Sequence, residues 1–155
     1  MRIDIVAVHR LGRSVEAELA RDYAARATAQ GRSLALGPVE IVEVEGSKSG
    51  KASEGEAILA AVGDGAWLMA CDERGETFTS RAFAERLARL RDQGERRVVF
   101  VLGGADGLSD EVRAAARGKI AFGPQTWPHA LARAMLAEQV YRACTILAGA
   151  PYHRD

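Results

Sequence analysis

Cysteine is scarce in this chain, and long apolar runs are missing. The 155 residues include only Cys71 and Cys144, too few for a disulfide framework or a metal-binding quartet of cysteines. No stretch approaches the roughly 18 apolar residues that a membrane span needs. The acid at position 4, inside a short apolar strand pattern, does not fit a secretory signal. We therefore expect a protein of the reducing cytoplasm, with no metal site and no membrane partner.

An excess of positive charge is also missing. The chain carries 21 basic and 21 acidic side chains, which argues against a protein that wraps nucleic acid through bulk electrostatics. Arginines nevertheless crowd one stretch, at positions 74, 81, 86, 89, 91, 96 and 97. We interpret this stretch as a solvated helix with i,i+4 pairs such as Glu85–Arg89. The alternative is a modest phosphate-facing surface.

Apolar runs alternate with helical patterns along the whole chain. Strands are expected at 2–8, 39–44, 66–71, 97–102 and 120–122, and helices at 14–30, 53–62, 80–93, 109–117 and 129–147. Ser14, Ser53 and Ser109 are the expected helix caps, Gly31 is a stop signal, and residues 72–75 form an expected turn. Near-continuous apolar strands between helices predict a mostly parallel sheet with both faces covered. Residues 1–155 should form one α/β domain, since no repeat, linker or low-complexity tract interrupts them.

Ligands of parallel sheets bind beyond the carboxyl ends of the strands, and three such ends carry unusual residues. The first is Cys71-Asp72, and the second is the glycine-rich segment 102–107. That segment reads G-G-x-x-G, which differs from the dinucleotide fingerprint, and the chain contains no phosphate-binding P-loop motif. Its glycines allow the backbone to approach a ligand closely, or they simply form a tight turn into the Ser109 helix.

The third strand end is the segment 122–129, in which prolines follow Gly123 and Trp127. The residue before a proline is pushed out of helical geometry, so this loop should be stiff and should keep free backbone groups. It would suit a flat, adenine-like ring beside Trp127. Alternatively, Trp127 is a core residue and Pro128 merely starts a helix.

The last helix and the tail carry further polar groups. His129 and Arg133 lie four residues apart and should share one helix face, whereas Glu138 and Arg142 should form a salt bridge. The tail, Pro151–Asp155, places aromatic, titratable and cationic groups where chains usually fray. It is either an exposed polar end or part of a functional site.

Several of these motifs together resemble the RlmH type of the SPOUT methyltransferase superfamily. The resemblance covers nearly the whole chain, and the Thr-Trp-Pro-His and Tyr-His-Arg segments are its most specific parts. The matching segments are Ile5–Val8, Glu54–Glu56, Asp72 with Gly75, Gly103–Gly104 with Gly107–Leu108, Thr126–His129, Arg133, Glu138–Gln139 with Tyr141–Ala143, and Pro151–Arg154.

The resemblance implies an enzyme that methylates N3 of a pseudouridine in large-subunit ribosomal RNA, free or within the ribosome. It further implies S-adenosylmethionine as the methyl donor, a trefoil knot in the C-terminal half, and a homodimer whose active site uses the partner's tail. The implied cofactor contacts are Cys71, Gly103, Phe122, Gly123, Pro124, Gln125, Thr126 and Trp127.

Roles for the remaining polar residues follow from the chemistry of this reaction. The pyrimidine N–H must lose its proton, and His153 is the only tail group that titrates near neutral pH. Arg154 could stabilise negative charge on the base, and His129 is a second candidate base or a positioning group. Tyr152 could stack on the target nucleotide, with Arg133 and Arg142 as further expected RNA contacts.

Two other functions are compatible with parts of the sequence. A Rossmann-type oxidoreductase would explain the sheet and the glycine loop, and it predicts tight binding of a nicotinamide dinucleotide. A catalytically inert RNA- or ribosome-binding module would keep the fold but would need a blocked pocket or an inert tail. The complete motifs at 126–129 and 152–154 argue against the inert module.

Overall fold

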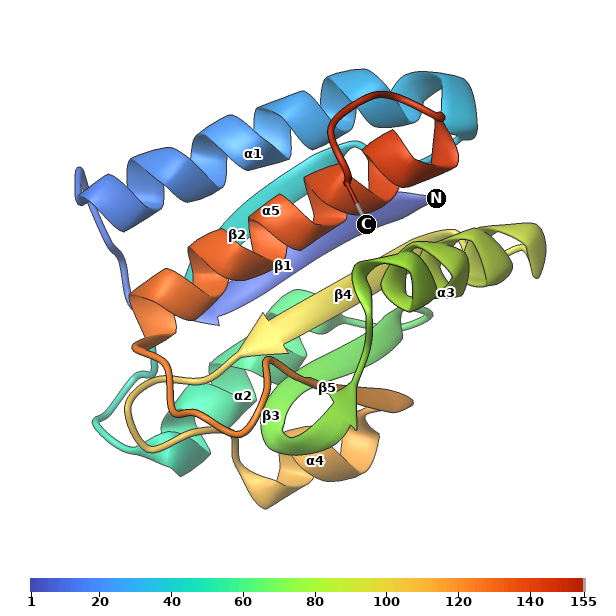
Figure 1. Ribbon diagram of the computed structural model, residues 1–155. Coiled ribbons are helices and arrows are strands. Elements are labelled where there is room, and N and C mark those ends of the chain that lie inside the picture. Colours follow the sequence, from blue (N-terminus) through green and yellow to red (C-terminus); the bar gives the residue numbers. More distant parts are fainter. Residues whose placement is uncertain (155) are drawn as a thin grey trace.

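The computed structural model describes residues 1–154 and contains one five-stranded sheet (Figure 1). All of its neighbouring strands pair in parallel, in the order β2-β1-β4-β3-β5. The strands are β1 (Arg2–Val8), β2 (Val39–Val44), β3 (Trp67–Thr77), β4 (Arg97–Leu102) and β5 (Gly118–Ala121). The predicted α/β class and parallel sheet are therefore confirmed.

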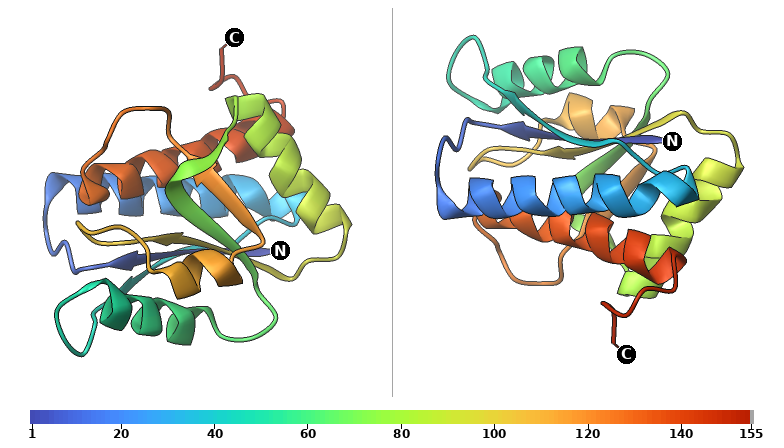
Figure 2. Two further views of the ribbon diagram at one scale, coloured as in Figure 1. Left: turned by 90° about the horizontal axis from the view of Figure 1, so that it is seen from below. Right: turned by 90° about the horizontal axis from the view of Figure 1, so that it is seen from above.

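Helices cover both faces of the sheet (Figure 2). They are α1 (Val15–Gly31), α2 (Lys51–Val62), α3 (Ser80–Asp92), α4 (Asp110–Ala115) and α5 (His129–Leu147), with a short 3₁₀ turn, η1 (Arg32–Leu34), after α1. Helices α1 and α5 lie side by side on one face together with α3, whereas α2 and α4 lie on the other face. No helix of residues 1–154 is long and apolar enough to cross a bilayer.

Strand β1 shows why the sheet is buried on both sides. Successive side chains of a strand point to opposite faces. Ile3 and Ile5 join the core under α1 and α5, and Val6 and Val8 join the core under α2 and α4. Each such side chain contributes about 1.5–3 kcal/mol when it is fully buried. An apolar run without polar alternation therefore specifies a central strand.

Helix boundaries agree with the capping signals at two of three serines. The hydroxyls of Ser14 and Ser109 accept hydrogen bonds from backbone N–H groups in the first turns of α1 and α4. The predicted cap at Ser53 is wrong, because α2 begins two residues earlier, after Gly50. The Ser53 hydroxyl instead accepts a 3.0 Å bond from the N–H of Lys48, within the preceding loop.

Gly31 ends α1 as predicted, but it does not end the helical segment by a left-handed backbone. Gly31 is the last residue of α1, but its backbone is right-handed, and the chain continues into η1. The left-handed residue that ends this segment is Ala35, with φ 54°. A Cβ on Gly31 would lie 2.3 Å from the carbonyl oxygen of Leu36, so close packing requires glycine here.

Strand β3 is longer than predicted because the expected turn at 72–75 lies inside it. Cys71 and Glu76 both pair with Ile120 of β5, so the four residues between them form a bulge. A Cβ on Gly75 would lie 2.5 Å from the Ile120 carbonyl carbon. Acidic and glycine residues are poor strand formers, which is why the sequence pattern indicated a turn.

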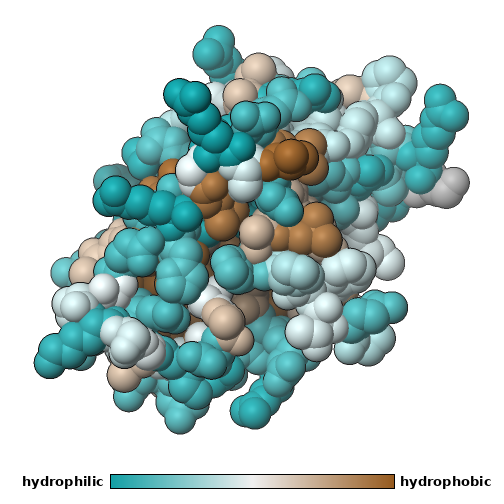
Figure 3. All heavy atoms as spheres, turned by 90° about the vertical axis from the view of Figure 1, so that its left-hand side faces the viewer, coloured by the Kyte–Doolittle hydropathy of each residue, from teal (hydrophilic) through white to brown (hydrophobic). Residues whose placement is uncertain are grey.

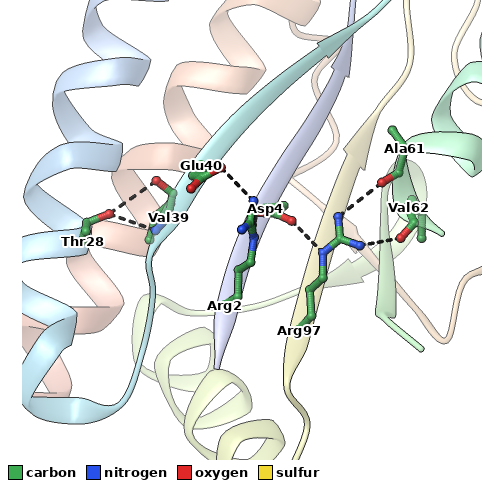
Figure 4. A network of polar contacts seen from close by, with 8 residues as sticks. All are labelled: Arg2, Asp4, Thr28, Val39, Glu40, Ala61, Val62 and Arg97. Atoms are coloured by element: carbon green, nitrogen blue, oxygen red, sulfur yellow. Dashed lines mark hydrogen bonds and ion pairs between the residues drawn. The ribbon is translucent and has the colours of Figure 1, made fainter. Parts of the chain in front are cut away.

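A buried carboxylate links the elements at the amino-terminal ends of the strands (Figure 4). Asp4 has no exposed surface and accepts bonds from Arg2 at 2.8 Å and Arg97 at 2.7 Å. Arg97 also donates to the carbonyls of Ala61 and Val62, at the end of α2. The network therefore joins β1, β4 and α2.

The arginines at 74–97 do not all belong to one surface. Arg97 points into the network around Asp4, Arg91 donates to the carbonyl of Leu34, and Arg86 lies over the ring of Trp67. These three side chains therefore have structural contacts within the protomer, so the phosphate-facing surface would have to come from the other arginines.

Candidate functional site

The carboxyl ends of the strands meet around a pocket of about 170 Å³. Of the eight predicted cofactor contacts, all but Pro124 line it. The lining residues are Cys71–Glu73, Leu102–Gly104, Gly107, Ile120–Gly123, Gln125–Trp127, His129 and Ala132. A second cavity of about 400 Å³ shares Gly104, Thr126, Trp127 and His129 with the first. Figure 3 shows the side of the molecule toward which β1 and β4 point, where apolar patches interrupt a hydrophilic surface.

The glycine loop after β4 is a tight turn, as one of the two interpretations predicted. The N–H of Gly107 donates a 3.0 Å bond to the carbonyl of Gly104, and Gly107 adopts φ 75°. A Cβ on Gly103 would lie 2.5 Å from the Gly107 carbonyl group. The loop therefore folds back on itself, with its backbone at the edge of the pocket.

The proline-bounded loop presents an aromatic side chain rather than burying it. Trp127 is 39% exposed, and its indole N–H donates a 3.2 Å bond to the carbonyl of Phe122. The alternative that Trp127 is a core residue is therefore wrong. Pro128 immediately precedes α5, and its carbonyl accepts from the N–H of Ala132. The loop therefore presents the Trp127 ring at the pocket.

Burial and one ion pair determine the pKa values of the ionisable groups beside the pocket. Burial, helped by the charge of Asp72, raises the pKa of the Cys71 thiol, so this cysteine is a poor nucleophile. Burial also opposes the charge on Asp72, but bonds from Arg113 at 2.5 Å and from the N–H of Arg74 at 2.9 Å outweigh it and lower the pKa of Asp72. Within residues 1–154, no group of three or more His, Cys, Asp or Glu side chains could hold a metal ion.

His129 lies at the start of α5 and lines both cavities. Its pKa is lowered by burial and by the neighbouring positive charges of His9 and Arg133, whereas Glu54 opposes that shift. A lowered pKa favours the neutral ring at physiological pH. His129 can therefore accept a proton at the pocket.

Sequence reasoning missed two residues of this region. No sequence motif singled out His9, but its ring centroid lies 5.6 Å from that of His129. Glu54 belonged only to the resemblance, yet its buried carboxylate lies 3.6 Å from His9 Nε2. The position of His9 at the carboxyl end of the first strand was the only available signal for this cluster.

Arg133 is 1% exposed, and this burial contradicts the expectation that it binds RNA. Its guanidinium donates to Glu43 at 2.5 Å and to the carbonyls of Val8 at 3.0 Å and His9 at 2.9 Å. The side chain instead attaches α5 to the ends of β1 and β2. Four-residue spacing places His129 and Arg133 on one face, but that face points into the protein.

The tail does not fray; it lies on the far half of α5. Tyr152 donates a 3.0 Å bond to Glu138 and packs against Tyr141 at a tilt of 60°, with ring centroids 4.7 Å apart. Arg142 makes the predicted salt bridge to Glu138, at 2.5 Å, and its guanidinium lies 3.2 Å from His153 Nδ1. Residue 155 lies outside the described residues.

The docked tail lies well away from the pocket of its own protomer. A helix rises about 1.5 Å per residue, so Arg142 is about 20 Å along α5 from His129. Tyr152 and His153 contact the Arg142 end. The structure therefore does not bring the tail residues together with the predicted cofactor residues within one chain.

A third cavity, of about 580 Å³, lies among α1, α3 and α5 and was not predicted. Its lining is mostly apolar and includes Leu19, Phe78, Phe83, Leu131 and Met135. Leu19 is 42% exposed, and Val15 on the same helix is 77% exposed. Glu138, which holds the tail, borders the same cavity.

These features define an α/β protein with a small-ligand pocket between a glycine turn and a proline-bounded loop at the carboxyl edge of a parallel sheet. The chain belongs to the SPOUT methyltransferase family, because the family profile described as "Predicted SPOUT methyltransferase" matches residues 1–153. It is therefore a methyltransferase, and the resemblance stated from the motifs is confirmed.

Relatives match over the full length. The chain is 66% identical to ribosomal RNA large subunit methyltransferase H of Phenylobacterium zucineum, over 100% of both chains. It is 64% identical to the protein of that name from Caulobacter vibrioides, over 100% of this chain and 99% of the relative. A solved probable methylase family protein from Haemophilus influenzae shares the fold, with a TM-score of 0.57 and 16% identity, over 99% of this chain and 70% of that one.

Proposed function

We propose that this chain transfers a methyl group from S-adenosylmethionine to N3 of a pseudouridine in large-subunit ribosomal RNA, as a homodimer in the cytoplasm. Full-length identity of 64% and 66% to proteins named ribosomal RNA large subunit methyltransferase H supports the RNA substrate. The target atom and base rest on the resemblance of the 126–129 and 152–154 motifs. The same matches favour an active enzyme over an inert ribosome-binding module and over an oxidoreductase.

The residues around the pocket fit the proposed methyl donor. The Phe122 and Trp127 rings and the free backbone of the loop suit a purine ring, and glycines at 103 and 123 allow close approach. At about 170 Å³ the pocket is smaller than most ligand cavities, so part of the donor would extend toward the adjoining 400 Å³ space. When bound, the donor supplies an electrophilic methyl group on a sulfonium. The holding residues would be Cys71, Gly103, Phe122, Gly123, Pro124, Gln125, Thr126 and Trp127.

The observation that supports the proposed homodimer is the position of the tail. Tyr152 and His153 are held at the end of α5 that is far from His129, so their contribution to catalysis would be to another protomer's pocket. The exposed apolar residues Val15 and Leu19, with the apolar cavity beside them, offer a surface that a second copy would cover. The site is complete only when two chains associate. The trefoil knot stays a prediction.

Methyl transfer of this kind is an in-line displacement, so alignment provides much of the rate enhancement. The acceptor N–H must also lose its proton, and either the partner's His153 or His129 can take it. Arg154, which is exposed, could stabilise negative charge on the acceptor base, while Tyr152 could stack on it. Arg142 contacts Glu138, Tyr152 and His153, so its main role would be to hold the tail in place.

The central experiment removes residues 152–155 and measures two properties separately. Calorimetry with S-adenosylhomocysteine reports the pocket, and methylation of large ribosomal subunits reports the reaction. We expect binding to persist while methylation is lost. Methylation at the wild-type rate would remove the tail from the mechanism, and a monomeric protein without affinity for S-adenosylhomocysteine would refute the proposal as a whole.

Mixed dimers give a sharper test of the shared site. The Trp127→Ala chain should lose the pocket but keep its tail, and the truncated chain should keep its pocket. Each preparation alone should be inactive, whereas refolding them together should restore part of the activity. No recovery in a mixture that light scattering shows to be dimeric would contradict exchange of tails between protomers.

A further inference from the structure

The backbone of His9 is held in an unusual conformation directly after β1. Its φ is 70°, in the left-handed region that few residues other than glycine adopt, although histidine, like asparagine and aspartate, occurs there more often than most. Its N–H donates a 3.0 Å bond to the carbonyl of Val44, and its own carbonyl accepts from Arg133. Strained residues that are fixed from several sides cluster at functional sites. This conformation therefore indicates a role for the His9 ring.

The ring of His9 lies between two carboxylates. Its Nδ1 is 3.4 Å from Glu45 Oε2, and its Nε2 is 3.6 Å from Glu54 Oε1. Glu45 is half exposed, whereas Glu54 is buried and its Oε2 has no hydrogen-bond partner among residues 1–154. A buried acceptor without a donor is costly unless a proton or ligand reaches it.

Gly104 brings this pair to the edge of the pocket. A Cβ at position 104 would lie 2.9 Å from both Glu54 Oε2 and His9 Nε2. The glycine therefore lets the two side chains contact the loop that lines both cavities. On the other side, the His129 ring meets that of His9 edge-on, at an interplanar angle of 61°.

We propose that His9 and Glu54 are positioning residues for methyl transfer, which hold the ring of His129 at the pocket and set the charge around it. In the balanced step, the acceptor nitrogen forms its bond to the methyl group as the sulfur–methyl bond breaks, and the sulfonium becomes a thioether. The N–H proton passes to His129 and from there to solvent. This inference rests on the proposed function and assigns the groups that position its base within one protomer.

The charged groups near His129 come from several elements, and Asp72 and Glu73 of β3 line the same pocket, with Asp72 paired to Arg113. His9 comes from the segment after β1, Glu43 and Glu45 from β2 and its end, Glu54 from α2, and Arg133 from α5. The glycine loop 103–107 contributes only the exposed Asp106, and the segment 122–128 contains no ionisable side chain. Glu54 favours the protonated His129, whereas His9 and Arg133 disfavour it.

The test uses His9→Asn and Glu54→Gln in the full-length dimer. Asparagine tolerates the left-handed backbone but does not titrate, and glutamine keeps the shape of Glu54 without its charge. Glu56→Gln, on the exposed side of the same helix, is the matched control. Single-turnover methylation is measured against pH, imidazole titration is followed by NMR, and S-adenosylhomocysteine binding is measured by calorimetry.

The two variants should move the pKa of His129 in opposite directions. Glu54→Gln removes a negative neighbour and should lower it, and His9→Asn removes a positive neighbour and should raise it. The acid limb of the rate profile should follow each shift, and the rate at neutral pH should fall about tenfold or more. Binding of S-adenosylhomocysteine and the control variant should change little.

Unchanged His129 titration and wild-type rates in both variants would overturn the inference, while methylation by the wild-type protein would leave the proposed function intact. Equal losses without opposite pKa shifts would reduce the pair to a structural role and would also overturn it. If His9→Asn fails to fold, Glu54→Gln alone decides between these outcomes. Failure of the wild-type protein to methylate ribosomal subunits would instead refute the proposed function.

Discussion

The guanidinium of Arg133 donates a 2.9 Å hydrogen bond to the carbonyl of His9, although 124 residues separate them in the sequence. The same group reaches Val8 and Glu43, so one side chain fixes the start of α5 against the ends of two strands. Because His129 lines the pocket and the ring of His9 packs against it, this contact helps to fix the geometry of the site, although Arg133 does not line the pocket.

Replacing Arg133 with methionine keeps the length of the side chain but removes its donors. Two backbone carbonyls and Glu43 would lose their partner, and we expect the free energy of unfolding to fall by about 3 kcal/mol. Urea denaturation measures this loss. Arg26→Met, which breaks an exposed i,i+4 pair with Asp22, should cost less than about 0.5 kcal/mol. Similar losses in the two variants would contradict the role assigned to Arg133.

Asp4 offers a second stability test, at the edge of the sheet away from the pocket. Asp4→Asn leaves Arg2 and Arg97 without their buried counter-ion, and we expect unfolding to become easier by about 3 kcal/mol. Glu40→Gln, which changes the half-exposed partner of Arg2, should have an effect near zero. Folded Asp4→Asn protein should still bind S-adenosylhomocysteine with wild-type affinity, and a weakened affinity would show that the network reaches the site.

Asp72 should make stability depend on acid pH. Burial opposes its charge, but Arg113 and the N–H of Arg74 lower its pKa below the ordinary value of 3.8. A lowered pKa in the folded state adds stability above the unfolded-state pKa, and this stability is lost as pH falls through the folded-state value. Asp72→Asn should flatten the stability curve below about pH 4. Asp110→Asn, which removes the exposed partner of Arg113, should leave the curve unchanged.

Both thiols should be inert in the folded protein. Burial raises the pKa of Cys144 to about 11, and burial together with the charge of Asp72 raises that of Cys71. An aromatic disulfide reagent at about pH 8 should therefore react slowly with the native chain and quickly in denaturant. Cys144→Ala isolates the signal of Cys71. Rapid reaction of that variant in its native state would show that the pocket exposes a thiolate.

The sequence predicted the sheet and most of the pocket, and the reason is geometric. Short apolar runs rich in β-branched residues, such as 98–102, favour central strands, and the carboxyl ends of parallel strands must meet. The loops at 103–107 and 122–128 therefore had to converge on one place, as they do around the cavity that they line. Local signals were also sufficient for the caps at Ser14 and Ser109, because each hydroxyl bonds within its own first turn.

Other features depend on contacts between distant residues and left no local pattern. The bulge in β3 is determined by the close approach of Gly75 to Ile120, and a window around Asp72 looks like a turn. No local sequence pattern around His9 predicts that Glu54 lies beside it. Similarly, the spacing of Arg133 from His129 gave the correct helix face, but the sequence could not tell that this face is covered.

The bond between Arg133 and the first strand also affects how the protein is made. Synthesis proceeds from the N-terminus, and domains generally fold as the chain emerges. The carbonyls of Val8 and His9 must wait for a side chain that is synthesised 124 residues after His9, in the helix that covers the core beside α1. We therefore expect nascent chains that stop before α5 to stay sensitive to proteases, with native protection arising only once α5 has left the ribosome.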